Sequence, residues 1–378
     1  MSDYLTENKE RNKKGEFDKT DVLSVSGDYG IVNQIELLGR SFAGASVLPY
    51  HVVRHGNIVY TKSPLKEYPY GIVKANTGVD GIVSTLYAVY NIKNNVDAQF
   101  IEYYFSSANR TNRYFKPIVR IGAKHDMKIG NQEVLANKVT FPNLEEQTKI
   151  ASLFRFLDER IATQNKIIED LKKLKCAIIE KVLNNSSCDK LRLGDVGSYI
   201  RGLTYSSNDV VECNDTLVMR SNNIVNGSSL DYTNNVVSVN KQISQEQQLQ
   251  DGDIIICMAN GSSALVGKSS FYDGKCSLPI TVGAFCGIYR SKMPITKWLF
   301  QTNRYRRYIW KSLQGGNGAI ANLNSEDVLR MKFPLPDKQT VEHCTKLLSS
   351  LESLIESNVS LCSMFSQQKE YLLRQMFI

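Results

Sequence analysis

The sequence predicts an α+β fold with an internal two-fold repeat, in which two mixed α/β domains are each followed by a long helix. Three observations support this prediction. The second half of the chain repeats motifs of the first half at a nearly constant offset, each half ends in a long helical pattern, and short strand-like runs precede each helix. At 378 residues the chain is long enough for two domains that each bury a core.

The composition is that of a globular protein with a basic excess. The 46 lysines and arginines outnumber the 38 aspartates and glutamates, and the net charge of +8 favours a polyanionic partner without identifying one. The eight cysteines form no C-x-x-C pair and have no histidine at ligand spacing, so we expect reduced thiols in a cytoplasmic protein. No apolar run approaches the ~20 residues that a membrane span needs, and the polar start does not resemble an export signal.

The repeat is clearest at an offset of 194 residues, where "NRTNRY" (Asn109 to Tyr114) aligns with "NRYRRY" (Asn303 to Tyr308). Further matches fall on apolar, glycine, proline and lysine positions, where a shared backbone would require them. These matches are Gly122 with Gly316, Val134 with Val328, Leu135 with Leu329, Lys138 with Lys332, Pro142 with Pro336, Leu153 with Leu347, Leu157 with Leu351, Ile161 with Ile355, and Lys175 with Lys369.

A second set of matches, at an offset of 196 residues, gives a meaning to the stretch "GDIIICMANGSSALVGKSS" that begins at Gly252. Its Gly-Lys-Ser is not a phosphate-binding loop, because five residues separate Gly261 from Gly267 where that motif needs four. The counterpart "GNIVYTKSPLKEYPYGIVKANTG" begins at Gly56 and has no Gly-Lys-Ser. Gly71 aligns with Gly267, and we expect both to mark a turn or bulge between two strands.

Each copy ends in a predicted helix of about ten turns. The first helix follows Asn143, which has Glu146 three residues later as in a capping box, and the second follows Asp337, which we interpret as an N-cap. Apolar residues recur every three or four positions in both, and we predict that the two seams pair, although packing of each helix on its own domain stays an alternative. The seam residues are Leu153, Leu157, Ile161, Leu171, Leu347, Leu351, Ile355 and Phe365.

Domain boundaries follow from the helices and from a polar break at Asn184 to Cys188. We predict a first domain over residues 1–140, a first helix with its linker over 141–190, a second domain over 191–332 and a second helix over 333–378.

Sequence motifs of the expected enzyme classes are missing. The chain has no Asn/Asp-Pro-Pro-Tyr/Phe tetrapeptide of an amino-methyltransferase, and no Glu-x-Lys follows Asp337 at nuclease spacing. His51 and His55 could share a metal only on a helix, and the strand-like residues between them favour a surface or strand-end position. We therefore predict no catalytic residue, no metal site and no cofactor.

Basic residues interleaved with aromatic ones are the candidates for DNA binding. Arginine can bind phosphate with two hydrogen bonds or contact guanine edges, and neighbouring rings support its planar group. The alternative for each residue is a solvated helix face with tyrosine and tryptophan in the core. The candidates are Arg110, Arg113, Lys116, Arg120, Lys124, Arg220, Lys268, Arg304, Arg306, Arg307, Lys311 and Asn317.

Three stretches resemble the specificity (S) subunits of type I restriction-modification systems: "FPNLEEQTKIASLFRFLDERI", its degenerate copy "FPLPDKQTVEHCTKLLSSLESLI", and "KLRLGDV", which opens the second domain. The resemblance implies two target recognition domains held apart by two conserved helices that form an antiparallel coiled coil. It further implies that each domain reads half of a split double-stranded DNA target, that methyltransferase subunits grip the helices, that restriction subunits join the complex, and that this subunit catalyses nothing.

The chain departs from that pattern at two points. The first copy has no "LGDV" opening, which at the 196-residue offset would precede Met1, and Val341 replaces Gln147 in the second helix, a position expected to affect methyltransferase contacts. Two alternatives stay open: a DNA-binding module of another class of restriction enzyme, and a coiled-coil scaffold that binds only protein. The sequence does not reveal which bases are recognised, because base choice depends on which side chains reach a groove.

Overall fold

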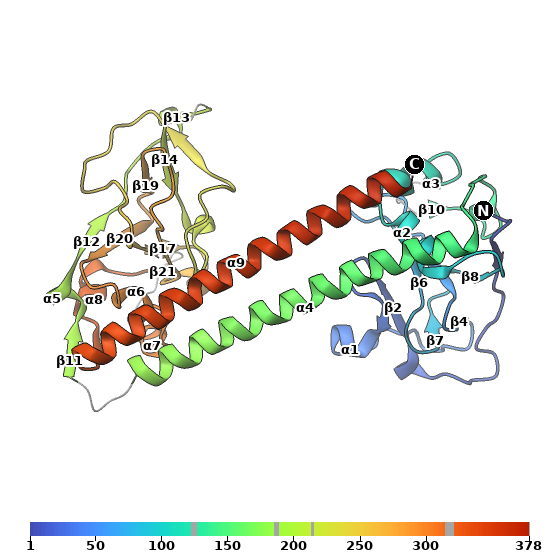
Figure 1. The fold of residues 1–378 in the computed structure, drawn as a ribbon, viewed down its shortest axis with the longest axis horizontal. Coiled ribbons are helices and arrows are strands. Elements are labelled where there is room, and N and C mark those ends of the chain that lie inside the picture. Colours follow the sequence, from blue (N-terminus) through green and yellow to red (C-terminus); the bar gives the residue numbers. More distant parts are fainter. Residues whose placement is uncertain (122–126, 185–188, 213–214, 314–320, 378) are drawn as a thin grey trace. The chain divides into compact units, whose positions relative to one another are not determined.

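The computed structural model describes residues 1–121, 127–184, 189–212, 215–313 and 321–377. The chain forms two compact units, one made of Met1–Asn165 with Ser360–Ile378 and the other of Lys166–Val359. Two long helices, α4 (Leu144–Leu183) and α9 (Lys338–Met376), each contribute to both units (Figure 1). The mixture of short strands with two long helices agrees with the predicted α+β class. None of the described helices is long and apolar enough to cross a membrane.

The first unit is built on a four-stranded antiparallel sheet. Its strands lie in the order β1 (Leu5–Glu7), β8 (Ala88–Ile92), β5 (Ile58–Tyr60) and β6 (Val73–Ala75). Three two-stranded sheets accompany it: β2 (Leu23–Ser26) with β3 (Gly30–Asn33), β4 (His51–Val53) with β7 (Gly81–Val83), and β9 (Arg120–Ile121) with β10 (Met127–Lys128). The short helices of this unit are α1 (Gln34–Leu38), α2 (Ala98–Phe105) and α3 (Ala108–Phe115).

Aromatic side chains fill the core of the first unit. Tyr60 of β5 stacks on Phe115 of α3, with ring centroids 4.4 Å apart. Phe154 from α4 and Phe377, which follows α9, enter the same core and stack at 5.8 Å. Burial of such large rings is the main source of stability in a domain of this kind, so both long helices are part of this unit and not appendages to it.

The second unit contains two four-stranded sheets. The first has the order β12 (Gly197–Arg201), β20 (Cys286–Ser291), β16 (Ile254–Cys257) and β18 (Ser269–Phe271), all antiparallel. The second has the order β13 (Val210–Val211), β15 (Val237–Val239), β14 (Thr216–Met219) and β19 (Ile280–Val282), with β14 and β19 parallel. Two-stranded sheets join β11 (Asp189–Arg192) to β22 (Lys332–Leu335) and β17 (Ala259–Asn260) to β21 (Ala321–Asn322). The short helices are α5 (Leu193–Val196), α6 (Thr296–Leu299), α7 (Asn303–Leu313) and α8 (Ser325–Arg330).

The aligned glycines Gly71 and Gly267 lie in the turns that lead into β6 and β18. Their φ angles are 86° and 79°, in the left-handed region that favours glycine. A Cβ atom on Gly267 would lie 2.6 Å from Ile309 of α7. The Gly-Lys-Ser of residues 267–269 is therefore part of a strand-turn-strand element, as the sequence predicted, and not the start of a helix.

Both long helices begin where their capping residues predict. The Asn143 side-chain oxygen accepts a hydrogen bond from the Glu146 backbone N–H at 2.9 Å. Asp337 accepts one from the Thr340 backbone N–H at 3.0 Å, and this bond together with one from the Thr340 hydroxyl lowers the pKa of the Asp337 carboxyl. These side chains satisfy backbone donors that have no partner within a first helical turn.

Within each unit, α4 and α9 contact each other through side chains. In the first unit Asp158 pairs with Lys369, and Asn165 accepts a hydrogen bond from the Cys362 thiol at 3.3 Å, which is an antiparallel arrangement. In the second unit the core contains Ile179 and Leu183 of α4 together with Cys344 and Leu348 of α9. The predicted association of the two helices is thus present in each unit.

The eight residues of the predicted seam differ in exposure. Leu351 and Ile355 are buried, and Leu157, Ile161, Leu171 and Phe365 are half-buried. Leu153 and Leu347, however, are 39% and 43% exposed. The next residues along each helix, Phe154 and Leu348, are buried in their place. Successive side chains on a helix point ~100° apart, so the buried face includes Phe154 and Leu348 and not the residue before each. The two leucines lie on the outer face.

Gln147, at the position where the two copies differ, is fully buried in the first unit. Its side-chain oxygen accepts a hydrogen bond from the Asp97 backbone N–H at 3.0 Å, and its amide donates to the carbonyls of Asn95 and Pro142 at 3.1 and 2.8 Å. Val341 is partly buried against the core of the second unit. At this position the difference between the two copies therefore concerns interior contacts.

His51 begins strand β4, which agrees with the predicted strand-end position, but it is buried with an exposed fraction of 1%, whereas His55 is exposed. The Nδ1 atom of His51 has no hydrogen-bond partner among the described residues. Burial, with smaller effects from Arg11 and Lys62, lowers the pKa of His51 from 6.5 to about 4. The imidazole is therefore neutral in the folded chain at neutral pH.

This burial predicts an acid-sensitive contribution to stability. Because the folded pKa lies below the unfolded one, stability from His51 is constant above pH 6.5 and falls as pH drops toward 4. We expect the stability advantage of the wild type over His51→Gln to shrink by about 3 kcal/mol between pH 7 and pH 4, measured by denaturant unfolding. His55→Gln is the control and should show no such change. Equal pH dependence in both variants would contradict the assignment.

Candidate nucleic-acid interface

Helix α7 presents a basic outer face because its inner face is anchored by apolar residues. The Thr302 hydroxyl accepts a hydrogen bond from the Tyr305 backbone N–H at 3.2 Å, which caps the helix start. Tyr305 and Ile309 are buried, and the Tyr305 hydroxyl donates to the Gly267 carbonyl at 2.8 Å. These contacts fix the rotation of α7 and leave five side chains exposed: Asn303, Arg306, Arg307, Trp310 and Lys311.

Part of this face forms a concave surface of about 210 Å³ lined by Arg304, Arg307, Tyr308 and Lys311. The Tyr308 hydroxyl donates to the Lys332 carbonyl at 3.0 Å, which holds its ring in place. Within the part of the chain that the structure describes, none of the three cations forms an ion pair with a carboxylate. Arg304 is half-buried and donates a hydrogen bond to the Asn184 side-chain oxygen at 3.4 Å, whereas Arg307 and Lys311 are exposed. Exposed cations without a carboxylate partner are suited to phosphate oxygens.

A second cavity, of about 630 Å³, lies beside the turn at Gly267. Lys268 and Arg306 line it together with Trp310, whose side chain is 63% exposed, and with the buried ring of Phe300. An exposed indole beside two cations can bind a planar group and an anion at once. The structure thus brings Lys268 and Arg306, which are 38 residues apart in the sequence, to one site.

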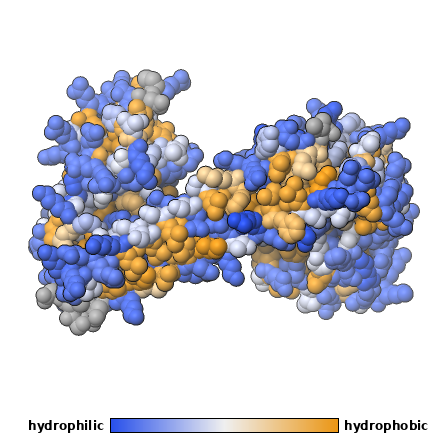
Figure 2. Space-filling view, in the orientation of Figure 1, coloured by the Kyte–Doolittle hydropathy of each residue, from blue (hydrophilic) through white to orange (hydrophobic). Residues whose placement is uncertain are grey.

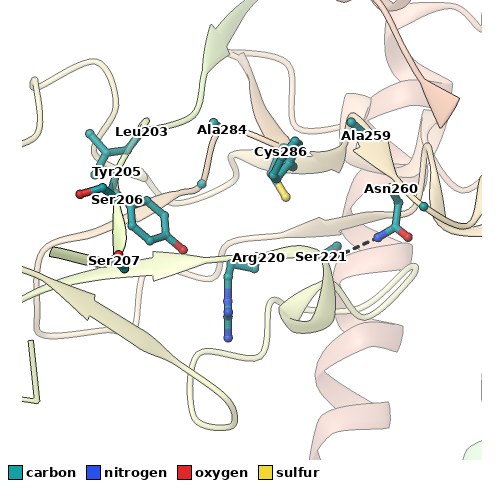
Figure 3. Close-up of a pocket in the computed structure, with 13 residues that line it drawn as sticks. Leu203, Tyr205, Ser206, Ser207, Arg220, Ser221, Ala259, Asn260, Ala284 and Cys286 are labelled. Carbon is teal, nitrogen blue, oxygen red and sulfur yellow. Dashed lines mark hydrogen bonds between the residues drawn. The ribbon is translucent and has the colours of Figure 1, made fainter. Parts of the chain in front are cut away.

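A third hollow, of about 520 Å³, surrounds Arg220, which directly follows strand β14 (Figure 3). Asn260 points toward Ser221 and donates a hydrogen bond to its hydroxyl at 3.2 Å. Arg220 donates to the Asn235 carbonyl at 3.2 Å, and Phe285 at the rim is 67% exposed. Guanidinium, amide and hydroxyl groups around one hollow offer the donors and acceptors that contact base edges.

Of the residues in this hollow, the sequence analysis found only Arg220. Asn260, Ser221 and Phe285 were missed because they lie on three separate segments of the chain, one of them strand β17, which meet only in the folded unit. A signal was present in "ANGSS", the short polar run that directly follows the buried strand β16 and residue Met258. Polar residues at the end of a buried strand commonly belong to a site.

The lining of the same hollow includes one thiol, that of Cys286, besides serine hydroxyls. Burial raises the pKa of the Cys286 thiol at its base to about 12, so the thiolate form is not available near neutral pH. Among the described residues, no group of three or more histidine, cysteine, aspartate or glutamate side chains could hold a metal ion. The site can bind a ligand, and we assign it no chemical step.

In the first unit, the two arginines of α3 point in different directions. Arg110 is turned inward, and its guanidinium donates to the carbonyls of Tyr104, Leu373 and Phe377 at 2.9, 3.2 and 2.7 Å. It also lies over the rings of Tyr104 and Phe377, and burial lowers its pKa. These contacts favour the structural alternative for Arg110, which ties the end of α9 to the first unit.

The other basic candidates of the first unit face solvent. Arg113, Lys116 and Arg120 are exposed and form no ion pair within the described ranges. Two further candidates, Lys124 and Asn317, lie outside the described residues. The structure therefore gathers Arg304, Arg307 and Lys311 at one surface and Lys268 with Arg306 at another, whereas Arg220 belongs to a different hollow of the same unit.

Sequence comparison finds relatives of one kind, although no family model matches the chain. The type I restriction enzyme EcoKI specificity subunit of Escherichia coli (strain K12) is 29% identical over 171 residues, which are 43% of this chain and 35% of that protein. The StySPI specificity subunit of Salmonella potsdam is 28% identical over 169 residues, again 43% of this chain and 35% of that protein. The match thus spans about a third of the length of these curated relatives.

A third relative and two solved structures extend the likeness. The putative MjaX specificity subunit of Methanocaldococcus jannaschii is 24% identical over 286 residues, 70% of this chain and 63% of that protein. The S subunit of the M. genitalium type I restriction-modification system superposes with a TM-score of 0.60 at 14% identity, covering 99% of this chain and 94% of that one. A chain from structures of type I complex assembly and conformational transition gives 0.53 at 14% identity, covering 99% and 97%.

These comparisons confirm the resemblance to type I specificity subunits that the sequence motifs indicated. The sequence matches agree on that kind of protein, and the structural matches extend the shared fold to nearly the whole chain.

The geometry of α3 predicts that replacing its two arginines will have different effects on stability. Replacing Arg110 with Met removes charge-assisted hydrogen bonds to three carbonyls, so we expect the free energy of unfolding of the first unit to fall by about 2 kcal/mol. Arg113→Met, the control on the same helix, should change it by less than about 0.5 kcal/mol. Denaturant unfolding measures both values. Equal effects would mean that Arg110 does not anchor α9.

Proposed function

We propose that this chain is the DNA sequence-specificity subunit of a type I restriction-modification complex. In this role it binds double-stranded DNA, recruits methyltransferase and restriction subunits, and carries out no catalytic step itself. The observation that carries the proposal is that the sequence comparison and the whole-chain fold comparison agree on the same family. No described feature favours a second function.

The proposed architecture is an internal two-fold repeat of a target recognition domain and a long helix, with the helices forming an antiparallel coiled coil. Strand order supports it, because each unit has an antiparallel four-stranded sheet in which the third and fourth strands are matched by the repeat. In the first unit Ile58 pairs with Ala75, and in the second Ile254 pairs with Phe271, which preserves the 196-residue offset on both strands. Left-handed glycines occur at matched positions of both turns.

Each recognition domain would bind one half of a bipartite DNA target. Arg113, Lys116 and Arg120 in the first unit and Arg306, Arg307 and Lys311 in the second are exposed cations without carboxylate partners among the described residues. Such cations suit phosphate contacts, which position a protein on DNA without selecting a sequence. The hollow around Arg220, with its amide and hydroxyl groups, suits the contacts to bases that select one.

The outer faces of the long helices would bind the methyltransferase subunits. Apolar side chains are exposed along α4 and α9, including Leu153 and Phe156 on α4 and Leu347 and Leu354 on α9, with 39%, 59%, 43% and 48% of each exposed. Figure 2 displays apolar residues at the surface of these helices. Exposed apolar rows on a helix commonly mark a protein interface. A protein-only scaffold would also use this face, but it would have no need for the unpaired cations.

The proposal is tested by co-expressing the chain with the methyltransferase subunit of its native host. We expect the two to co-purify and to methylate DNA at one bipartite sequence, which methylation mapping of the host genome identifies. Co-purification without sequence-specific methylation would support the scaffold alternative instead, and absence of both would overturn the proposal.

A first prediction concerns Arg113 and Arg307, which are matched across the repeat. If they contact phosphates, replacing either with Ala should weaken binding to all DNA sequences and reduce the slope of log affinity against log salt by about one. Arg330→Ala is the matched control, because Arg330 is exposed but paired with Glu326 at 2.6 Å. Fluorescence anisotropy over a range of salt concentrations gives the slopes. Slopes equal to that of the control would contradict the phosphate contacts.

A second prediction concerns Leu153 and Leu347. Because both side chains are already exposed, replacing them with Ser should leave the melting temperature nearly unchanged. Binding of the methyltransferase subunit should nevertheless weaken by about five- to thirty-fold for each replacement, as measured by titration calorimetry. Leu86→Ser is the control, because Leu86 is 71% exposed but lies in the turn before β8. Unchanged affinity in both variants would exclude this face as the docking site.

A further inference from the structure

One ion pair joins α4 and α9 in each unit. In the second unit the Lys175 ammonium lies 3.3 Å from the Glu352 carboxylate, and in the first unit the Lys369 ammonium lies 2.5 Å from the Asp158 carboxylate. The 194-residue offset matches Lys175 with Lys369 and Asp158 with Glu352. Each copy of the repeat therefore supplies one lysine and one carboxylate, and each pair joins one copy to the other.

The pair in the second unit is the centre of a buried polar cluster. Glu352 and Lys175 are 8% and 7% exposed. Glu352 also accepts a hydrogen bond from the fully buried Trp298 indole N–H at 2.8 Å and lies 2.7 Å from the Lys297 ammonium. Lys175 donates to the Gly227 carbonyl at 2.8 Å. One carboxylate thus connects both long helices to α6 of the recognition domain.

The first unit has a smaller and more exposed version. Asp158 accepts a hydrogen bond from the Tyr103 hydroxyl at 3.0 Å, and the Lys369 ammonium lies 5.6 Å from the centre of the Tyr103 ring. Tyr103 of α2 is matched with Lys297 by the same 194-residue offset. The side chain of Asp158 is 41% exposed, whereas that of Glu352 is 9% exposed. The connection is therefore common to both units, but only the second buries it.

A buried cluster of charged side chains contributes little net stability to a fold. Taking ions out of water costs several kcal/mol each, and well-packed apolar residues in place of a buried pair are often as stable. Apolar contacts, however, tolerate small changes in register and rotation, whereas a carboxylate with three directed donors does not. The cluster is thus suited to selecting one arrangement of the domain on the helices.

We propose that Glu352 is a positioning residue that fixes the orientation of the second recognition domain on the helix pair, and through it the separation at which the second DNA half-site is accepted. Asp158 has the same role in the first unit, with a smaller effect because water competes for its contacts. This inference rests on the proposed function, since half-site separation is defined only for a bipartite target.

The test uses the full chain, alone and in complex with its methyltransferase subunit. Glu352→Gln removes the carboxylate charge and leaves the buried Lys175 and the half-buried Lys297 without a counter-ion, so we expect the melting temperature of the chain to fall by about 6 to 12 °C. The neutral triple variant Lys175→Met/Glu352→Gln/Lys297→Met retains an acceptor for Trp298 and should regain most of that loss. Asp158→Asn, the matched control, should lower the melting temperature by less than about 3 °C.

The decisive measurement is methylation of DNA whose half-sites are one base pair closer or farther apart than in the native target. We expect the triple variant to lose discrimination against these spacers by about tenfold while it still methylates the native site, whereas Asp158→Asn loses much less. A purely structural cluster would give wild-type discrimination once stability is regained, and that result would overturn the inference.

A further variant, in which the ion pair between the two helices is kept, allows the inference to be tested if the triple variant does not fold. Lys297→Met leaves the Lys175–Glu352 pair intact, so it should fold and still relax spacer discrimination, and wild-type discrimination in this variant would also refute the inference. Failure of the proposed function is recognised separately, because the wild-type complex would then methylate no bipartite site. In that case the melting temperatures still test the cluster, and equal values for Glu352→Gln and Asp158→Asn would refute it.

Discussion

The length of the two helices is the constraint on which the rest of the structure depends. A helix of 40 residues extends about 60 Å, which is more than one compact domain of this size can cover. Each helix therefore needs a partner along its whole length, and in each unit that partner is the other helix together with a core. Ala151 and Phe154 of α4 belong to the core of the first unit, and Ile179 and Leu183 belong to that of the second.

The charges of the chain serve two purposes that the structure separates. Some arginines are held by carboxylates: Arg290 pairs with the buried Asp253 at 2.6 Å, and Arg54 contacts Glu10, Glu16 and Asp80. The exposed arginines of α3 and α7 have no such partners among the described residues. A net charge of +8 is by itself weak support for a polyanionic ligand. The presence of exposed arginines without carboxylate partners in the described ranges, on two helices that the repeat matches, is a stronger argument.

The sequence predicted local features well because their causes are local. Asn143 and Asp337 cap helices through atoms within three residues, and Gly267 permits the left-handed turn that it forms. The face of a long helix is harder to predict, because a shift of one position, as from Leu153 to Phe154, turns the contact by ~100°. Periodicity alone does not resolve a shift of that size when apolar residues occupy both positions.

Contacts between segments that are distant in the sequence could not be predicted from the sequence. Arg110 has the same neighbours in the sequence as a DNA-binding arginine would have, and only the fold brings Leu373 and Phe377 within reach of it. Asn260, Ser221 and Phe285 meet in one hollow for the same reason. The sequence thus located the basic helices correctly as surface elements, but it could not distinguish an arginine that binds the protein from one that is free to bind a ligand.

The position of Phe377 has a consequence for synthesis of the chain. This ring packs between Phe100 and Phe154 in the first unit, although it is translated after the whole of the second unit. The second unit is continuous, from Lys166 to Val359, and all of its strands are available before the end of α9 is made. The strands of the first unit are therefore translated before those of the second, but the core of the first unit is completed later. Until the end of α9 is made, the apolar surface of the first unit is exposed and can form non-native contacts.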